Sequence, residues 1–259
     1  MNWLQSLNLD LFLVFTLVLS RVSGLTMSAP IFGTRDIPAP ARALLAFAVA
    51  LLVMPTQTNV EFAHPGTTVN YLVFIGAEIM IGLCLGLGIT VLFSGVQLGG
   101  QMVARIGGMM LADVFDPAAG EQVPLFSKLL YMLALAVFVL IGGHRILMSA
   151  LLDTFEAIPP GRGVLPGGLT ETFTVLLAQS FSLGMRASMP VVTALLLSTL
   201  VLGLIGRTMP QLNIIMVGFG LNAMLSFAAM ALTLGAALWV FQDQIIPTMQ
   251  IIMEMLTGG

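Results

Sequence analysis

Long runs of hydrophobic residues follow one another along nearly the whole chain, separated by short polar segments. An α-helix rises about 1.5 Å per residue, so about 20 apolar residues cross a hydrocarbon core of roughly 30 Å. About six stretches reach or approach that length, at residues 9–31, 41–54, 69–98, 125–152, 172–205 and 211–241. The pattern predicts an all-α, polytopic membrane protein built from about six long hydrophobic helices.

Several of these stretches are longer than one crossing requires, and the fifth contains Pro190 near its middle. Proline interrupts helical hydrogen bonding, and a long apolar run adapts to the bilayer by tilting or kinking, so we expect partly broken or strongly tilted helices. The connecting segments are too short to fold as domains. We therefore expect one membrane-embedded domain over residues 1–259, ending in a short amphipathic tail at 242–259.

The composition agrees with a membrane environment. Apolar residues make up 58% of the chain and charged residues 8%, with a mean hydropathy of +1.04. Soluble domains contain about 25% charged residues, so lipid or other subunits must cover this surface. The net charge of −3 is spread thinly, with no basic block, and this disfavours nucleic-acid binding.

Glycines at four-residue spacing predict where helices pack closely. Gly82 and Gly86 form one such pair, and Gly95 and Gly99 form another. In lipid, small residues allow two helix backbones to approach closely, so we expect these glycines to lie at helix contacts within the chain.

Residues suited to catalysis or metal binding are scarce. There is one cysteine, Cys84, and the two histidines, His64 and His144, lie far apart in the sequence. No nucleophile and base have a plausible spacing, and no Gly-Lys-Ser/Thr follows the glycine-rich stretch near residues 99–108. We expect no enzyme activity, no metal and no cofactor, and we interpret His144 as a helix-interface residue.

Ionisable residues inside the apolar runs are the main anomaly. They are Arg21, Glu78, Lys128 and Arg186. Such residues are costly in lipid unless they pair or face water, so they indicate either a relay in a transport pathway or buried pairs that fix helix packing. Because Glu78 is the one carboxylate well inside a run, we favour the pair, with Arg21 as the expected partner and Arg105 as the second choice.

The connector around residues 105–122 has an unusual composition of glycine and methionine. Glycine is conformationally permissive and methionine is flexible and polarizable, so the segment is suited to sealing against an object of changing shape. The alternative is an irregular loop buried among helices. The candidate residues are Arg105, Gly107, Gly108, Met109, Met110, Asp113, Asp116, Pro117 and Gly120.

Blocks of residues along the chain resemble the FliR family of bacterial flagellar export-gate proteins. The N-terminal block contains Arg21–Gly24, Ala29–Arg35 and Ala41–Ala46, and the C-terminal block contains Arg207, Met209–Asn213 and Val217–Phe219. Among these, the signature residues are Pro30, Gly33, Arg35, Arg42, Arg207, Pro210, Gln211 and Asn213. The sequence departs from the family at Gly220, where proline is usual, and its residues 107–112 match only loosely.

This resemblance implies a structural and gating subunit of a flagellar type III export apparatus. Its partners would be FliP and FliQ in the pore core, with FlhB close by, and unfolded proteins would pass through the complex. The location would be the bacterial inner membrane at the flagellar basal body, with residues 105–122 acting as a plug. The injectisome counterpart is the near alternative, and a secondary transporter is the alternative from another class, although we find no inverted repeats.

Overall fold

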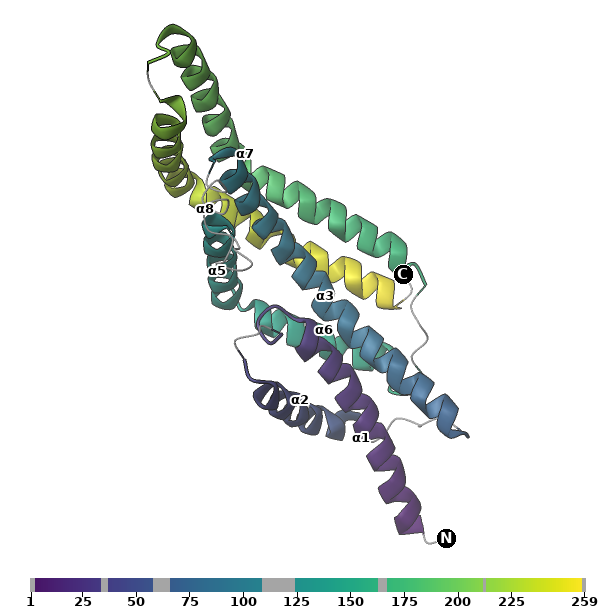
Figure 1. The fold of residues 1–259 in the computed structure, drawn as a ribbon. Coiled ribbons are helices and arrows are strands. Elements are labelled where there is room, and N and C mark those ends of the chain that lie inside the picture. The colour runs from purple at the N-terminus through teal and green to yellow at the C-terminus, as the bar shows by residue number, and fades with distance from the viewer. Residues whose placement is uncertain are drawn as a thin grey trace. The chain divides into compact units, whose positions relative to one another are not determined.

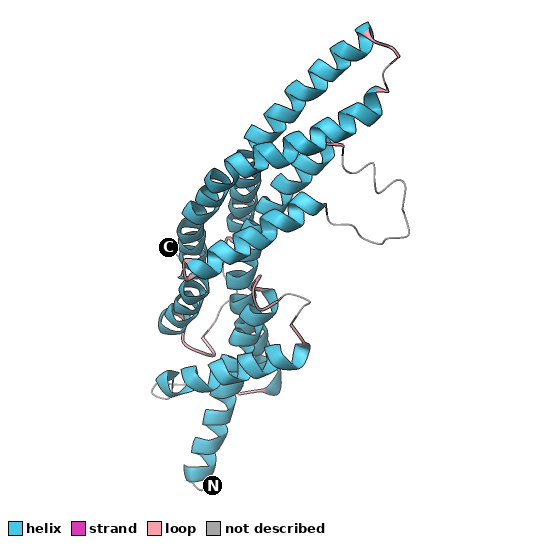
Figure 2. Ribbon diagram, turned by 90° about the vertical axis from the view of Figure 1, so that its left-hand side faces the viewer, coloured by secondary structure: helices cyan, strands magenta, loops and turns pink. Residues whose placement is uncertain are grey.

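The computed structural model describes residues 3–33, 37–57, 66–108, 124–162, 167–211 and 213–257. All the regular secondary structure in these residues is helical (Figure 2). The helices are α1 (Trp3–Ser28), α2 (Ala39–Val53), the 3-10 helix η1 (Met54–Gln57), α3 (Thr68–Ile106), α5 (Leu125–Leu140), α6 (Gly143–Ala157), α7 (Leu169–Thr208) and α8 (Ile214–Thr257).

Within the described residues, five helical segments are long and apolar enough to cross a membrane. The pair α5 and α6 also passes this test when taken together, which brings the number of candidate spans to as many as six. The prediction of an all-α polytopic membrane protein with about six hydrophobic helices is confirmed.

The broken helix is in the fourth predicted run and not in the fifth. α7 continues through Pro190 without interruption, whereas the run at 125–152 divides into α5 and α6, which are bent by 65°. Gly142, between them, has a φ of 77°, a left-handed conformation that glycine adopts without a Cβ penalty. A proline removes only one backbone donor, and a membrane helix can satisfy the freed carbonyl in other ways. The left-handed backbone conformation of Gly142, and not a proline, therefore determines where the helix breaks.

The described contacts divide the chain into two compact units. Unit 1 comprises residues 1–91, 141–176 and 245–259, and unit 2 comprises residues 92–140 and 177–244. The helices α3, α7 and α8 each contribute to both units. Since neither unit is continuous in sequence, the expectation of a single domain stays a prediction.

In unit 1, α1 contacts both α2 and the first half of α3 (Figure 1). The rings of Phe15 and Phe47 join α1 to α2 at a centroid distance of 5.5 Å. The contact with α3 is tighter, because a Cβ added to Gly24 would lie 2.5 Å from the carbonyl oxygen of Ile79. Gly82 likewise faces the backbone of Arg21. The two helices therefore approach through glycine, as the sequence spacing predicts.

Unit 2 has an aromatic centre on α3. The ring of Phe93 lies within edge contact of Tyr131 and Phe138 on α5, and of Phe241 on α8 at 5.0 Å. Less than two turns further along, α3 meets α7, where a Cβ on Gly99 would lie 2.8 Å from the carbonyl oxygen of Gly184. The ring of Phe93 thus fills the space between α3 and its neighbours α5 and α8, whereas Gly99 lets α7 approach the backbone of α3 closely.

Beyond this centre, α7, which ends at Thr208, and α8, which begins at Ile214, form a helical hairpin (green and olive in Figure 1). Ser198 Oγ donates a hydrogen bond of 2.7 Å to Asn222 Oδ1 across the hairpin. This is a polar contact between two otherwise apolar helices. It fixes how the two helices face each other.

The C-terminal residues 242–257 are part of α8, so the helix that the hydrophobic pattern ended at 241 extends to Thr257. Gln242, Asp243 and Gln244 lower the local hydropathy without breaking the helix. Within unit 1 the end of α8 is amphipathic, with one buried side formed by Ile245, Thr248, Met249, Ile252 and Leu256. These three polar residues therefore separate the apolar part of α8 from its amphipathic end, and the helix continues through them.

Candidate functional site

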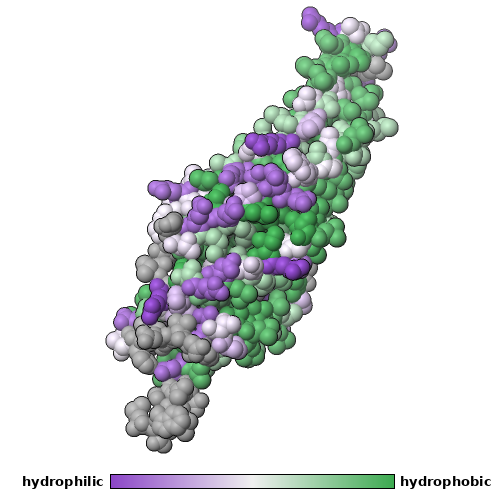
Figure 3. Space-filling view, turned by 180° about the vertical axis from the view of Figure 1, so that it is seen from behind, coloured by the Kyte–Doolittle hydropathy of each residue, from purple (hydrophilic) through white to green (hydrophobic). Residues whose placement is uncertain are grey.

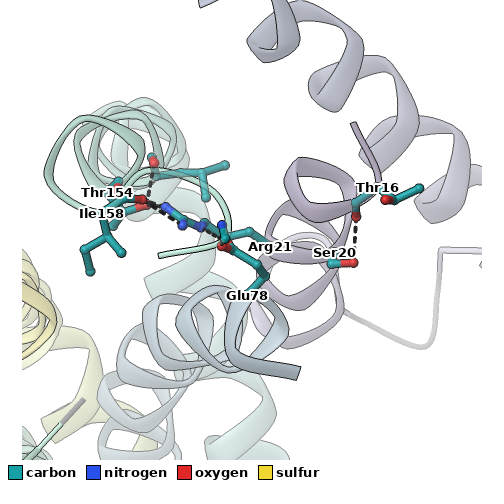
Figure 4. Close-up of polar contacts among 8 residues, drawn as sticks. Thr16, Ser20, Arg21, Glu78, Thr154 and Ile158 are labelled. Atoms are coloured by element: carbon teal, nitrogen blue, oxygen red, sulfur yellow. Dashed lines mark hydrogen bonds and ion pairs between the residues drawn. The ribbon is translucent and has the colours of Figure 1, made fainter. Parts of the chain in front are cut away.

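Arg21 on α1 and Glu78 on α3 form a buried ion pair in unit 1 (Figure 4). Arg21 Nε lies 2.6 Å from Glu78 Oε2, and both side chains are fully buried. The close glycine contact between α1 and α3 brings the two backbones near enough for this geometry. The structure thus brings together the two residues that the sequence analysis paired.

The rest of the guanidinium binds the C-terminal end of α6. Arg21 Nη1 donates to the carbonyl oxygen of Thr154 at 2.8 Å and to its Oγ1 at 3.2 Å, and Nη2 donates to the carbonyl oxygen of Ile158 at 2.9 Å. Carbonyls at a helix C-terminus lack partners within the helix and carry partial negative charge, so a cation stabilises them. The guanidinium also stacks on Phe155, 4.2 Å from the ring centroid.

Glu78 extends the cluster to the turn that follows α6. The backbone N–H of Gly161 donates to Glu78 Oε1 at 3.0 Å, while Oε2 is engaged by Arg21. Both carboxylate oxygens therefore have partners, and the cluster joins α1, α3, α6 and the turn at 158–161. Breaking a buried ion pair by removing one partner costs about 3–5 kcal/mol, because the other charge remains buried. This geometry favours a structural cross-link over a relay.

The main-chain members of this cluster were not predicted. The carbonyls of Thr154 and Ile158 and the N–H of Gly161 have no side-chain signature, although the Pro159-Pro160-Gly161 sequence does indicate a turn. Arg105, the second expected partner of Glu78, is exposed in the last turn of α3 and belongs to unit 2.

The predicted gate segment is described only at its start. The N–H of Gly107 donates to the carbonyl oxygen of Val103 at 2.9 Å, and that of Gly108 donates to the carbonyl oxygen of Arg105 at 3.2 Å. Gly108 has a φ of 75°, which ends α3 in the conformation that glycine favours at helix C-termini. The other candidates lie outside the described residues: Met109, Met110, Asp113, Asp116, Pro117 and Gly120.

The signature residues fall in separate places. Pro30 is buried and Gly33 is half-buried in the turn after α1, where the N–H of Gly33 donates to the carbonyl oxygen of Ala29 at 2.7 Å. Arg42 is half-buried in the first turns of α2, and Arg35 lies outside the described residues. At the hairpin tip, four signature residues are exposed, namely Arg207, Pro210, Gln211 and Asn213.

No group of three or more His, Cys, Asp or Glu side chains suited to a metal ion occurs in the part of the chain that the structure describes. His144 is half-buried at the start of α6, and its Nδ1 has no hydrogen-bond partner among the described residues. The prediction that His144 is an interface residue is not tested by these contacts.

Residues 12–247 match the sequence profile of a family described as bacterial export proteins, family 1. The chain belongs to this family. Three proteins that are similar to this chain are each named flagellar biosynthetic protein FliR. The protein of Bacillus subtilis is 32% identical over 225 residues, which covers 85% of both chains. The protein of Escherichia coli is 30% identical over 89% of this chain and 85% of its own, and that of Aquifex aeolicus is 29% identical over 85% and 86%.

The resemblance to the FliR family is thereby confirmed. The matched range contains Arg21, Glu78 and the whole of the predicted gate segment, so these residues lie within the part of the chain that the family shares. Membership of the FliR family favours protein export over the secondary transporter as the function of this fold.

Proposed function

We propose that the chain is the FliR-type subunit of the flagellar type III export apparatus, and that it forms the core of the export gate with FliP and FliQ. FlhB would lie beside this core, in the bacterial inner membrane at the flagellar basal body. The role is structural and gating, with no enzymatic step. The observation that carries the proposal is the large apolar helix surface that this chain does not cover by itself.

The long helices leave most of their hydrophobic surface uncovered. Within an apolar 18-residue stretch of α7 and of α8 only 17% of the residues are buried, against 50% within such a stretch of α3. At 40 and 44 residues, α7 and α8 are about 60 and 66 Å long, roughly twice the hydrocarbon core. Lipid hydrocarbon can cover only about half of such a length, and other subunits would cover the apolar surface that neither lipid nor this chain covers.

One face of α8 carries four exposed small residues beside the exposed Met224. Gly220, Ala228, Ala231 and Gly235 are all exposed on this face, and a Cβ at Gly220 or Gly235 would meet no atom within 4 Å. Each helical glycine costs about 1 kcal/mol relative to alanine. In lipid, small residues at such spacing favour the close approach of another helix. We propose that a helix of a neighbouring subunit packs on this face.

The gate segment is the second part of the proposal, and it rests on sequence and family resemblance. We propose that residues 105–122 help to hold the conduit shut while unfolded substrates are absent. The glycines at 107 and 108 and the methionines at 109 and 110 provide the deformability that a seal around an unfolded chain requires.

The assembly is tested by copurification. A tagged chain, expressed with FliP and FliQ and gently solubilised, should retain both proteins. Gly220→Leu and Gly235→Leu should reduce the retained FliP or FliQ at least severalfold, because a large side chain on this face prevents close helix approach. Gly203→Leu on α7 is the matched control, since it makes the same change at another exposed helical glycine with no atom within 4 Å. Full retention in all three variants would contradict the proposed contact.

A further inference from the structure

One face of α7 carries large aliphatic side chains between two exposed arginines. The α7 stripe, as we name it, consists of Met189, Leu196, Leu197, Leu200 and Leu204, all between 49% and 69% exposed. Arg186 and Arg207 are exposed at its two ends. They are 21 residues apart, almost six whole turns, so both arginines project from the same face as the stripe.

The distance between the arginines matches the thickness of one bilayer core. At 1.5 Å per residue, Arg186 and Arg207 are about 31 Å apart along the helix, against a hydrocarbon thickness of about 30 Å. Residues 187–206 contain no charged side chain. On the returning helix, residues 214–241 are also uncharged. Figure 3 shows the hairpin with a hydrophobic surface and hydrophilic residues gathered at its tip.

Other residues of unit 2 mark the same level as Arg186. Ser188 Oγ lies 3.9 Å from Met102 Sδ, and Ser127 Oγ donates to the carbonyl oxygen of Gln97 at 3.0 Å. Arg186 and Lys128, which is also exposed, therefore lie beside the same turns of α3. Trp239 is 66% exposed on α8, two residues before Phe241, which contacts Phe93, one to two and a half turns before these residues of α3. Lysine and arginine at one level, with tryptophan nearby, are typical of a membrane–water interface.

The composition of the α7 stripe favours lipid as its occupant. The stripe consists of the large side chains leucine and methionine and contains none of the small residues that let a second helix backbone approach closely in lipid. Phosphate groups of anionic phospholipids can supply a counter-charge to Arg186 and Arg207, because long basic side chains extend to the interface.

We propose that the α7 stripe faces the hydrocarbon core of the bilayer, and that Arg186 and Arg207 bind the headgroup phosphates of anionic phospholipid in the two leaflets. The arginines then define the membrane boundaries of this hairpin. Gln242, Asp243 and Gln244 lie beyond the Arg186 level, outside the hydrocarbon. This inference goes beyond the proposed export function and does not depend on which proteins pass through the complex.

The hydrocarbon contact is tested with nitroxide labels in the complete complex, reconstituted in phospholipid vesicles. In a Cys84→Ala background, cysteine is introduced singly as Leu197→Cys, Gly235→Cys or Gln242→Cys, and each label is probed with oxygen and with a water-soluble nickel chelate. Oxygen concentrates in hydrocarbon and the chelate in water. We expect position 197 to collide with oxygen and not with nickel, position 242 to collide with nickel, and position 235 to collide with neither. Collision with neither reagent at position 197 would show a protein cover, and collision with nickel would show a wet conduit; either result would overturn the proposal.

The headgroup contact is tested with spin-labelled lipids in the same vesicles. The measurement is the fraction of spin-labelled phosphatidylglycerol held immobile by the complex, relative to phosphatidylcholine. Arg186→Gln and Arg207→Gln should each lower this preference by about a third to a half, while Arg186→Lys should retain it. Arg145→Gln, which removes an exposed arginine from α6 in unit 1, controls for the net charge. If both glutamine variants assemble and keep the full preference, the arginines do not bind lipid phosphate.

Discussion

Gly184 on α7 lies directly against Gly95 on α3, and the Cβ that Gly184 lacks would collide with the carbonyl oxygen of Gly95. A Cβ added to Gly95 would in turn collide with the carbonyl oxygen of Ser180, one turn before Gly184 on α7. Here the two backbones touch without intervening side chains. A contact of this kind tolerates no added atom, because a backbone carbonyl cannot rotate away as a side chain can.

Substitution at this contact should therefore destabilise unit 2. Gly184→Val and Gly95→Val should each cost about 1–3 kcal/mol or more through overpacking, and should lower the thermal midpoint of the purified complex. Gly76→Val is the matched control, since a Cβ at Gly76 on α3 meets no atom within 4 Å. Equal midpoints for all three variants would show that the helices separate there at no cost.

The Arg21–Glu78 pair should be coupled energetically. Arg21→Ala and Glu78→Ala should each reduce the yield of assembled complex severalfold, consistent with about 3–5 kcal/mol for a buried charge left without its partner. The double variant should lose less than the sum of the two. Arg145→Ala, an exposed arginine on α6, should leave the yield unchanged. Strictly additive losses would argue against the pairing.

The backbone acceptors of Arg21 should matter more than the Thr154 hydroxyl. Thr154→Val removes Oγ1, which accepts from Arg21 and donates to the carbonyl oxygen of Leu151, but it keeps the main-chain acceptor. We expect a loss of about 1 kcal/mol, far below that of Arg21→Ala. Thermal denaturation of the complex distinguishes the two. A loss as large as that of Arg21→Ala would mean that the hydroxyl, and not the helix end, holds the guanidinium.

Removal of residues 107–110 should raise the resting permeability of the assembled complex, because it shortens the segment that we propose as the seal. Small-solute swelling of liposomes that carry the complex measures this leak. Copurification of FliP and FliQ with the deleted chain serves as the control for assembly. An assembled complex with unchanged leak and unchanged export would show that this segment is only a connector.

The sequence by itself determined the fold class, the family and the most important buried pair. Runs of about 20 apolar residues report membrane helices because hydrocarbon demands internal backbone hydrogen bonding over a set length. Arg21 and Glu78 could be paired from sequence because an isolated charge at apolar depth is costly, and Glu78 was the one carboxylate placed there. The sequence also predicted that the glycine pairs at 82 and 86 and at 95 and 99 lie at helix contacts, since small residues at this spacing form one helix face.

Only the tertiary structure decided where the helices break and what completes the buried cluster. Hydropathy could not separate α5 from α6 at Gly142, because a left-handed glycine inside an apolar run has no hydrophobic signature, whereas Pro190 has an obvious one and leaves α7 unbroken. The carbonyls of Thr154 and Ile158 and the N–H of Gly161 are groups that almost every residue has. Their role depends on position alone, and position is a property of the folded chain.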